Sequence, residues 1–319
     1  MSDTEMTIER PGRNNGEFDR PVMLAICGDS ATGKTTISDG LVGALGPERI
    51  TAACVDDYHR YDRSERKALP FTPLNPQCNY MDIMTQHLKL LAAGEPILKP
   101  VYSHSDGSLS RPELVEPRQF VIIDGLLPLY NKALRSSFDV TVFLDPPEEI
   151  RYEWKYKRDT SKRGYTKDEV AADLKKREPE SKKFIHPQRA NADIVVRFAP
   201  IEERGETPDD PLSATLLLRP TISHPDLTGI VTDEVREAMH LKLTRDDDGK
   251  PVDALHIHSY APREMTRQVE EAIWSELGVD EPLPDTLGKI NGERDEPLAI
   301  TQLILLYHLI QAKQERFSS

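Results

Sequence analysis

Short apolar runs alternate with longer segments in which apolar residues recur at helical spacing, over about two thirds of the chain. A continuous apolar run bounded by turn residues or acids is typical of a strand buried on both faces. Five such strands are predicted, at Pro21–Cys27, Arg49–Val55, Arg118–Gly125, Asp139–Asp145 and Ala192–Phe198. Helices are predicted between them, at Lys34–Leu45, Met81–Ala93, Pro147–Arg158 and Thr166–Arg177. This alternation predicts an α/β fold with a parallel sheet and right-handed crossovers.

Two stretches depart from this pattern. Residues 95–117 are rich in Pro, Ser and Gly and are predicted to form a long loop. The alternation stops near Pro200, where IEERGETPDDP is a predicted linker. Beyond it, ATLLLRP and DALHIHSY predict strands, and residues 263–277 and 298–316 predict helices. This smaller α+β region either continues the sheet or forms a separate unit.

The chain therefore divides into three parts. Residues 1–20 are polar and aperiodic and are predicted to be a loose tail. Residues 21–200 form the predicted α/β domain, and residues 201–319 form the appended C-terminal region.

Charge and composition narrow the class of protein. The 319 residues include 41 basic and 54 acidic ones, for a net charge of −13. That balance argues against a nucleic-acid partner, because phosphate backbones bind basic faces. No apolar run approaches the roughly 20 residues of a membrane span, and the first residues lack the apolar core of a signal peptide. Three cysteines make no disulfide framework. We expect a cytoplasmic protein without a membrane partner.

The strongest motif is the run GDSATGKT at residues 28–35, which fits G-x-x-x-x-G-K-[ST] at every fixed position. It follows a predicted buried strand and opens a predicted helix, the context that this phosphate-binding loop requires. Backbone N–H groups and the helix dipole would face the phosphates of ATP, while Lys34 reaches the outer phosphates. The predicted ATP-binding residues are Gly28, Asp29, Ser30, Ala31, Thr32, Gly33, Lys34, Thr35 and Thr36.

Acidic residues follow three of the predicted strands, and ligands of open α/β sheets bind at those strand ends. Asp56 is the candidate general base of a kinase that acts on an alcohol. The adjacent Asp57 either shares this role or simply begins the next turn. Asp124 and the Thr35 hydroxyl are the candidate ligands of Mg²⁺, with a helix cap as the alternative for Asp124. Asp145, before two prolines, is predicted to cap the next helix.

With these residues in place, the chain resembles the phosphoribulokinases, within the phosphoribulokinase/uridine kinase family of P-loop kinases. The resemblance runs through residues 21–200 and is carried, in order, by GDSATGKTT, VDDYHRYDR, KPVYSH, VIIDGL, WKYKRDTSKRGYT and ANADIVV. It implies Mg²⁺- and ATP-dependent phosphorylation of the C1 hydroxyl of ribulose 5-phosphate, with Asp56 and Lys34 as catalytic residues. The run PLAITQLILLYHLIQAK also resembles the terminal helix of the longer, plant- and cyanobacterial-type enzymes. A homodimer formed through sheet edges is implied as well.

The resemblance also implies residues that bind the sugar phosphate or the transferring phosphoryl group: His59, Arg63, Tyr102, His104, Lys155, Arg158 and Arg163. Physical chemistry supports such a set, because a chain of charge −13 must build a local cationic pocket to hold two anionic substrates. Lys155 and Arg158 are three residues apart and share a helix face, and Arg163 follows in a predicted mobile lid. The alternatives are a solvated, salt-bridged helix face for these cations, surface positions for the histidines, and a packed aromatic residue for Tyr102.

Three departures from the family pattern bear on the prediction. Asp124 stands where the family often has Glu, and Leu127 stands where it has His, which affects substrate identity more than reaction class. A uridine/cytidine kinase is therefore the main alternative, and a nucleotide-binding protein without catalysis is the second. Thr32 replaces a redox-active cysteine of the plant enzymes, so Cys27 and Cys54 are interpreted as buried, inert thiols.

Overall fold

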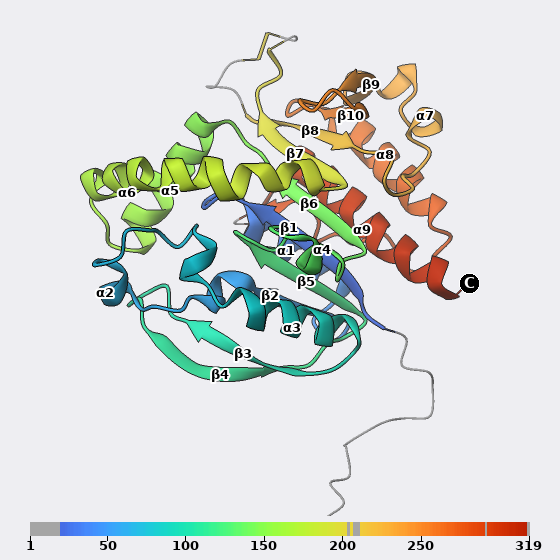
Figure 1. Ribbon diagram of the computed structural model, residues 1–319. Helices are drawn as coiled ribbons and strands as arrows, with labels where there is room; N and C mark the ends of the chain where they lie inside the picture. The colour runs from blue at the N-terminus through green and yellow to red at the C-terminus, as the bar shows by residue number, and fades with distance from the viewer. Residues whose placement is uncertain (1–19, 203–204, 207–210, 291, 318–319) are drawn as a thin grey trace, which may run out of the picture.

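The protein is described by a computed structural model that covers residues 20–202, 205–206, 211–290 and 292–317. An eight-stranded sheet in the order β2-β5-β1-β6-β7-β8-β10-β9 forms its centre (Figure 1). The first five strands of that order pair in parallel, which confirms the predicted α/β class. They are β2 (Ile50–Cys54), β5 (Phe120–Gly125), β1 (Val22–Gly28), β6 (Val140–Leu144) and β7 (Ile194–Ala199).

Helices cover both faces of the sheet because successive residues of the buried strands point to opposite sides. Leu24 and Ile26 of β1 pack in one apolar cluster with α1 (Lys34–Leu45), α8 (Arg263–Glu276) and α9 (Glu296–Phe317). Met23 of β1 packs on the other face with α3 (Met81–Ala92). The helices α5 (Glu148–Lys162) and α6 (Lys167–Glu180) lie side by side beyond β6 (Figure 1).

The C-terminal region continues the same sheet, one of the two arrangements that the sequence left open. Three antiparallel strands extend it from β7: β8 (Ser213–Leu218), β10 (Pro251–Ile257) and the edge strand β9 (Met239–Arg245). Helix α9, red in Figure 1, packs against α1, β1 and β8, and its residues 298–310 are all buried. The apolar run of this helix is therefore part of the main core.

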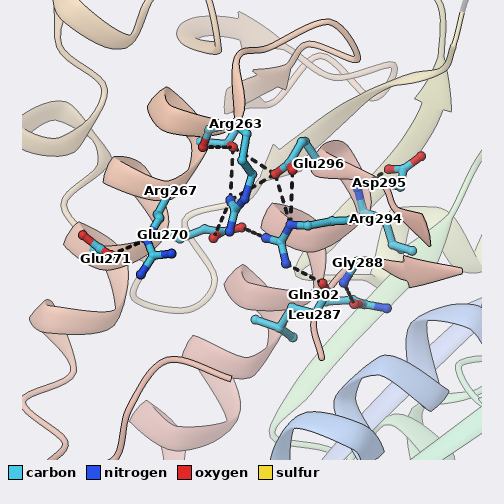
Figure 2. Close-up of polar contacts among 12 residues, drawn as sticks. Arg263, Arg267, Glu270, Glu271, Leu287, Gly288, Arg294, Asp295, Glu296 and Gln302 are labelled. Atoms are coloured by element: carbon cyan, nitrogen blue, oxygen red, sulfur yellow. Dashed lines mark hydrogen bonds and ion pairs between the residues drawn. The ribbon is translucent and has the colours of Figure 1, made fainter. Parts of the chain in front are cut away.

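An ionic cluster fastens the start of α9 to α8 (Figure 2). Glu270 of α8 is 1% exposed and pairs with Arg294 and, at 3.0 Å, with Arg263. Glu296 pairs with the same two arginines at 3.2 and 3.3 Å. The two arginines thus neutralise the buried charge of Glu270, which would be costly to leave unpaired.

Gln302 of α9 makes a direct connection to the phosphate-binding helix. Its Nε2 donates to the carbonyl of Thr36 in the first turn of α1 at 3.0 Å. Its Oε1 accepts from the backbone of Gly288 at 2.7 Å (Figure 2). Glycine is required opposite it, because a Cβ at Gly40 would lie 2.0 Å from Gln302 Nε2. The C-terminal helix therefore contacts the start of α1 closely.

The prediction of a long loop over residues 95–117 was wrong. This stretch forms an antiparallel ribbon of β3 (Ile97–Tyr102) and β4 (Leu109–Val115), separate from the main sheet. Six of the seven residues of β4 are exposed, so the strand has no apolar pattern to reveal it. The edge strand β9 was also missed, although Met239, Leu241 and Leu243 alternate with polar residues as a half-buried strand would.

The remaining elements are short: α2 (Arg63–Arg66), α4 (Lys132–Arg135), α7 (Leu227–Ile230), β11 (Lys289–Ile290) and β12 (Glu293–Arg294). The predicted loose tail lies outside the described residues except for Arg20, and so does part of the predicted linker. None of the helices in the described part of the chain is both long and apolar enough to cross a membrane.

Candidate active site

The predicted phosphate-binding loop lies between β1 and α1 and has the required backbone shape. Gly33, with φ of +94°, precedes the first turn of α1, and Ala31 also adopts a left-handed conformation, with φ of +67°. The buried Lys34 side chain donates to the carbonyls of Gly28 at 2.9 Å and Asp29 at 2.7 Å. Backbone N–H groups in such alternating conformations form an anion-binding concavity at a helix N-terminus.

Asp56 lies in a 3₁₀ turn, Val55–Tyr58, that follows β2. Its Oδ1 accepts a hydrogen bond of 2.8 Å from the backbone of Leu126, just after β5. The approach needs a glycine at position 125, where φ is +153° and a Cβ would lie 2.4 Å from Val55 and 3.0 Å from Asp56 Oδ1. Among the described residues Asp56 Oδ2 accepts no hydrogen bond, which leaves one carboxylate oxygen to meet a substrate.

The neighbouring Asp57 has a different environment. Its carboxylate accepts from the buried ammonium of Lys99 and, at 3.1 Å, from the backbone of Tyr102, both on β3. Both oxygens are therefore engaged in holding the β3–β4 ribbon to the end of β2. This arrangement favours Asp56 over Asp57 as the candidate base.

Asp124 lies at the end of β5, level with Cys54 of β2 and Ile26 of β1. Burial raises the pKa of its carboxyl, the nearby Asp56 raises it further, and Lys34 opposes both. A carboxylate and the exposed Thr35 hydroxyl are the hard oxygen donors that Mg²⁺ prefers, and a cation there would offset the cost of the buried charge. Asp124 caps no described helix, since Asn131 caps the next one, α4.

Asp145 was predicted to cap the helix that follows β6, and this prediction was wrong. The N-cap of α5 is Pro147, which supplies no side-chain hydrogen bond. Asp145 instead pairs with Arg189 at 2.8 Å. The Asp145 side chain is therefore engaged in a tertiary ion pair with a residue 44 positions away instead of capping the helix.

His59 is buried, and its proton can be placed from its partner. Asn79 donates through Nδ2 to the carbonyls of Pro73 and Asn75, so its Oδ1 is the acceptor. His59 Nδ1, 2.7 Å from that oxygen, therefore carries the proton. Burial lowers the pKa of His59 to about 4, against the opposing effect of Asp56. The ring is neutral at pH 7, so its Nε2 is an acceptor for a substrate hydroxyl.

Tyr102 stands between the two predicted histidines. Its ring meets His59 and His104 edge-on, with centroids 4.8 and 5.1 Å apart. The guanidinium of Arg66 lies 4.7 Å from the Tyr102 ring centroid and donates to its hydroxyl. The three predicted residues therefore form one continuous wall.

The pKa of His104 is affected by both the acids and the cations of the site. Burial lowers its pKa, the charges of Arg163 and Arg158 lower it as well, and Asp56 acts in the opposite direction. Arg158 of α5 and Arg163, directly after α5, therefore act on the same histidine as Asp56. Arg63 joins the same region, with Nη2 2.7 Å from the His104 carbonyl.

The three predicted cations of α5 share one acidic partner, Asp159, which is buried. Lys155 Nζ lies 2.7 Å from it and 3.0 Å from Asp173 of α6, and Arg163 lies 3.5 Å away. Arg158 pairs with Asp159 at 2.8 Å and also donates to the Ser30 hydroxyl of the phosphate loop at 3.1 Å. Arg158 thus reaches the loop directly, whereas the role of the buried Lys155 as a phosphate ligand stays a prediction.

Some residues of the site were not predicted. Arg151 pairs with Asp29 of the phosphate loop at 3.5 Å. A signal for it existed, because Arg151, Lys155 and Arg158 follow the i, i+4, i+7 spacing of one helix face. Lys99 and Asn79, which hold Asp57 and His59, carry no local signal of this kind.

The three cysteines are free. Burial raises the pKa of the Cys27 thiol to about 12, and its sulfur contacts Gln188 Oε1 at 3.3 Å. Burial and the neighbouring carboxylates Asp56 and Asp124 raise the pKa of Cys54 as well. A thiol that resists deprotonation is a poor nucleophile, in agreement with the interpretation of inert cysteines.

Comparisons with known proteins agree with this geometry. A phosphoribulokinase from Synechocystis is 41% identical over 184 residues, 58% of this chain and 55% of the relative. A uridine kinase from Lactiplantibacillus plantarum is 32% identical over 182 residues, 56% of this chain and 87% of the relative. The structure of phosphoribulokinase from Rhodobacter spheroides matches with a TM-score of 0.57 at 15% identity, over 79% of this chain and 99% of that one. That last likeness concerns the fold alone.

The match spans about half the length of the Synechocystis phosphoribulokinase and of a chloroplastic phosphoribulokinase from Spinacia oleracea. The model of the family described as "Phosphoribulokinase / Uridine kinase family" matches residues 23–203, more than half of the chain and nearly all of the predicted α/β domain. The chain therefore belongs to the phosphoribulokinase/uridine kinase family.

Proposed function

We propose that this protein transfers the γ-phosphoryl group of ATP to the C1 hydroxyl of ribulose 5-phosphate, giving ribulose 1,5-bisphosphate and ADP. The observation that carries the proposal is the placement of Asp56, whose carboxylate is oriented by Leu126 and has an oxygen left for a substrate. Only β5 separates β2, which Asp56 follows, from β1, which the phosphate loop follows. A base at the end of one strand therefore faces an anion cradle at the end of the other.

The nucleotide half of the proposal uses the phosphate loop. Backbone N–H groups of the loop and of the first turn of α1 bind the phosphates, and Lys34 leaves its two carbonyl partners to meet the outer phosphates. Thr35 and Asp124 would hold Mg²⁺, which would neutralise the negative charge of the phosphates when bound. Arg158, already at the Ser30 hydroxyl, is placed to contact the transferring group.

In the acceptor half, Asp56 orients the sugar hydroxyl and accepts its proton as the oxygen bonds to the γ-phosphorus and the bond to ADP breaks. His59 Nε2 accepts a second hydroxyl of the sugar, since its Nδ1 proton is held by Asn79. Arg63 and Arg163 are the proposed partners of the 5-phosphate, together with the wall formed by Tyr102 and His104. The hydrogen bond from Arg63 to the His104 carbonyl supports the first assignment, and the effect of Arg163 on the pKa of His104 supports the second.

A uridine/cytidine kinase is the second candidate, favoured by the match to a uridine kinase of which 87% is covered. A neutral nucleoside acceptor has no phosphate for Arg63 and Arg163 to bind, and both arginines act on His104. A coupled assay of ADP release, with Mg-ATP and either ribulose 5-phosphate or uridine, separates the two. Turnover with ribulose 5-phosphate alone is expected. Turnover with uridine alone would replace the proposal, and nucleotide binding without turnover of either would contradict both.

We further propose that the protein acts in the cytoplasm as a homo-oligomer, most simply a dimer. In the described part of the chain the sheet ends at β2 and β9, with no further strand paired beyond either. An open edge strand offers a row of backbone donors and acceptors to a second copy. Light scattering on the purified protein tests this, and a monomer at all concentrations would contradict it.

A further inference from the structure

The phosphate loop contains an acid, Asp29, at a place where an acid is unexpected. The loop is built to bind a polyanion, yet this carboxylate lies inside it and the residue is 5% exposed. A buried negative charge opposes phosphate binding unless other groups neutralise it. Asp29 contributes its backbone carbonyl to the loop, where it accepts from Lys34 and Thr32. Its side chain must therefore serve something other than the phosphates.

The partners of the Asp29 carboxylate come from the two helices that carry the cations. Oδ2 accepts from the hydroxyl of Ser181, directly after α6, and lies 3.5 Å from Arg151 of α5. Oδ1 accepts from the backbone of Ser30 at 2.6 Å. Both Arg151 and Ser181 are buried. With the bond from Arg158 to the Ser30 hydroxyl, two adjacent loop residues hold α5 and the end of α6.

A local irregularity brings Ser181 to this position. Pro179 lies inside the last turn of α6, and the chain continues as a π-helical turn, Ser181–Ile185. Proline disrupts the regular hydrogen-bond ladder, and π turns are frequent at functional sites. The Ser181 hydroxyl also contacts His186 Nε2 at 3.1 Å, across this turn. The turn thus presents the Ser181 hydroxyl to the loop directly after α6.

We propose that Asp29 is a positioning residue that couples the phosphate loop to the pair α5–α6, so that nucleotide on the loop sets the position of Arg158 and Arg163. The backbone of Asp29 belongs to the nucleotide-binding loop, whereas its side chain acts through Ser181 and Arg151. The kinetic part of this inference rests on the proposed function, because it concerns delivery of those arginines to the acceptor.

The first test separates nucleotide binding from turnover. Asp29→Ala should lower kcat about tenfold and raise the acceptor KM about tenfold, while the Kd for ADP changes less than threefold. Asp29→Asn, which keeps the acceptor for Ser181 but loses the charge that faces Arg151, should fall in between. Lys182→Ala is the matched control, because it removes an exposed ion pair one residue beyond Ser181. Kinetics of Asp29→Ala equal to those of wild type would overturn the proposal.

The second test asks whether Asp29 acts through Ser181. Ser181→Ala should give part of the Asp29→Ala effect, and the double variant should be no worse than Asp29→Ala alone, because residues that act as a unit are not additive. Fully additive effects would contradict the coupling. If Asp29→Ala does not fold, Asp29→Asn paired with Ser181→Ala gives the same comparison.

The third test needs no acceptor. In wild type, ADP should slow amide hydrogen exchange in residues 148–163 and 177–186 as well as in the phosphate loop. In Asp29→Ala, ADP at saturating concentration should protect the loop only. Equal protection of the two helices in both proteins would overturn the coupling. A protein that shows the wild-type protection but phosphorylates no acceptor would contradict the proposed function and leave the coupling supported.

Discussion

The backbone N–H of Leu126 donates a 2.8 Å hydrogen bond to Oδ1 of Asp56, across a gap that only a glycine at position 125 allows. This bond fixes one carboxylate oxygen, and among the described residues the other accepts no hydrogen bond. A base that is held in place before the substrate arrives loses little freedom when it reacts.

Asp56→Asn is expected to lower kcat by about 10²–10⁴ and to change the Kd for ADP less than threefold. The amide keeps the size and the acceptor for Leu126 but cannot take a proton, and general-base catalysis contributes an effect of about that size. Steady-state kinetics and calorimetric titration with ADP measure the two quantities. Asp57→Asn is the matched control, and it should reduce stability more than kcat because Asp57 pairs with the buried Lys99. A kcat of Asp56→Asn within tenfold of wild type would remove Asp56 from its role.

Arg63→Ala is expected to raise the KM for ribulose 5-phosphate by about 10- to 100-fold, since a charge-assisted hydrogen bond contributes about 1.5–3 kcal/mol. The KM for ATP should stay within threefold. Arg60→Ala is the comparison, because Arg60 is exposed and stacks on Tyr80 at 5.2 Å, away from His104. A raised ATP KM with an unchanged sugar KM would place Arg63 on the nucleotide side.

Two glycines of α1 should respond oppositely to alanine. Gly40→Ala places a methyl group against the side chain of Gln302, which is buried and makes two hydrogen bonds. We expect the free energy of unfolding to fall by about 1–3 kcal/mol. Gly43→Ala meets only Thr286 at 3.7 Å, an ordinary contact, so helix propensity should stabilise it by about 0.5–1 kcal/mol. Urea unfolding of both variants measures these changes. A Gly40→Ala protein as stable as Gly43→Ala would show that Gln302 moves aside without cost.

His308 of α9 should make the protein less stable in mild acid. Burial lowers its pKa from 6.5 to about 3, and the neighbouring His224 lowers it further. Below pH 6.5 His308 is protonated in the unfolded chain but stays neutral in the folded chain. The free energy of unfolding therefore decreases as the pH falls toward 3. Between pH 7 and pH 5 this residue alone should remove about 2 kcal/mol.

The matched variant is His308→Gln, whose amide can still donate to His224. Urea unfolding at pH 7 and pH 5 should show a pH-dependent loss about 2 kcal/mol smaller in the variant than in wild type. Equal losses in the two proteins would mean that His308 is protonated in the folded state.

The parts of the molecule that were predicted correctly are those with a local signal. The phosphate loop combines a buried strand, glycines and a helix start within a few residues, so neighbours in sequence determine its shape. The five parallel strands are continuous apolar runs because both of their faces are covered. The ribbon β3–β4 lacked such a signal, since β4 is exposed over most of its length.

The site illustrates the same limit at the level of single residues. The sequence did not decide whether Asp57 shares the role of general base with Asp56. The choice between them depends on Lys99, 42 residues beyond Asp57. The proton on His59 depends on Asn79, which in turn is oriented by two backbone carbonyls. Partners of this kind are brought together only by the tertiary fold, and a single sequence does not reveal them.

The hydrogen bond from Gln302 to Thr36 joins residues that are 266 positions apart, and the helix that carries it covers β1 and α1. During synthesis the nucleotide-binding strand leaves the ribosome long before its covering helix is made. Until α9 is made, a large apolar surface of the nascent chain stays uncovered, and such high contact order slows folding. The unfinished chain is therefore more prone to aggregation than the complete fold.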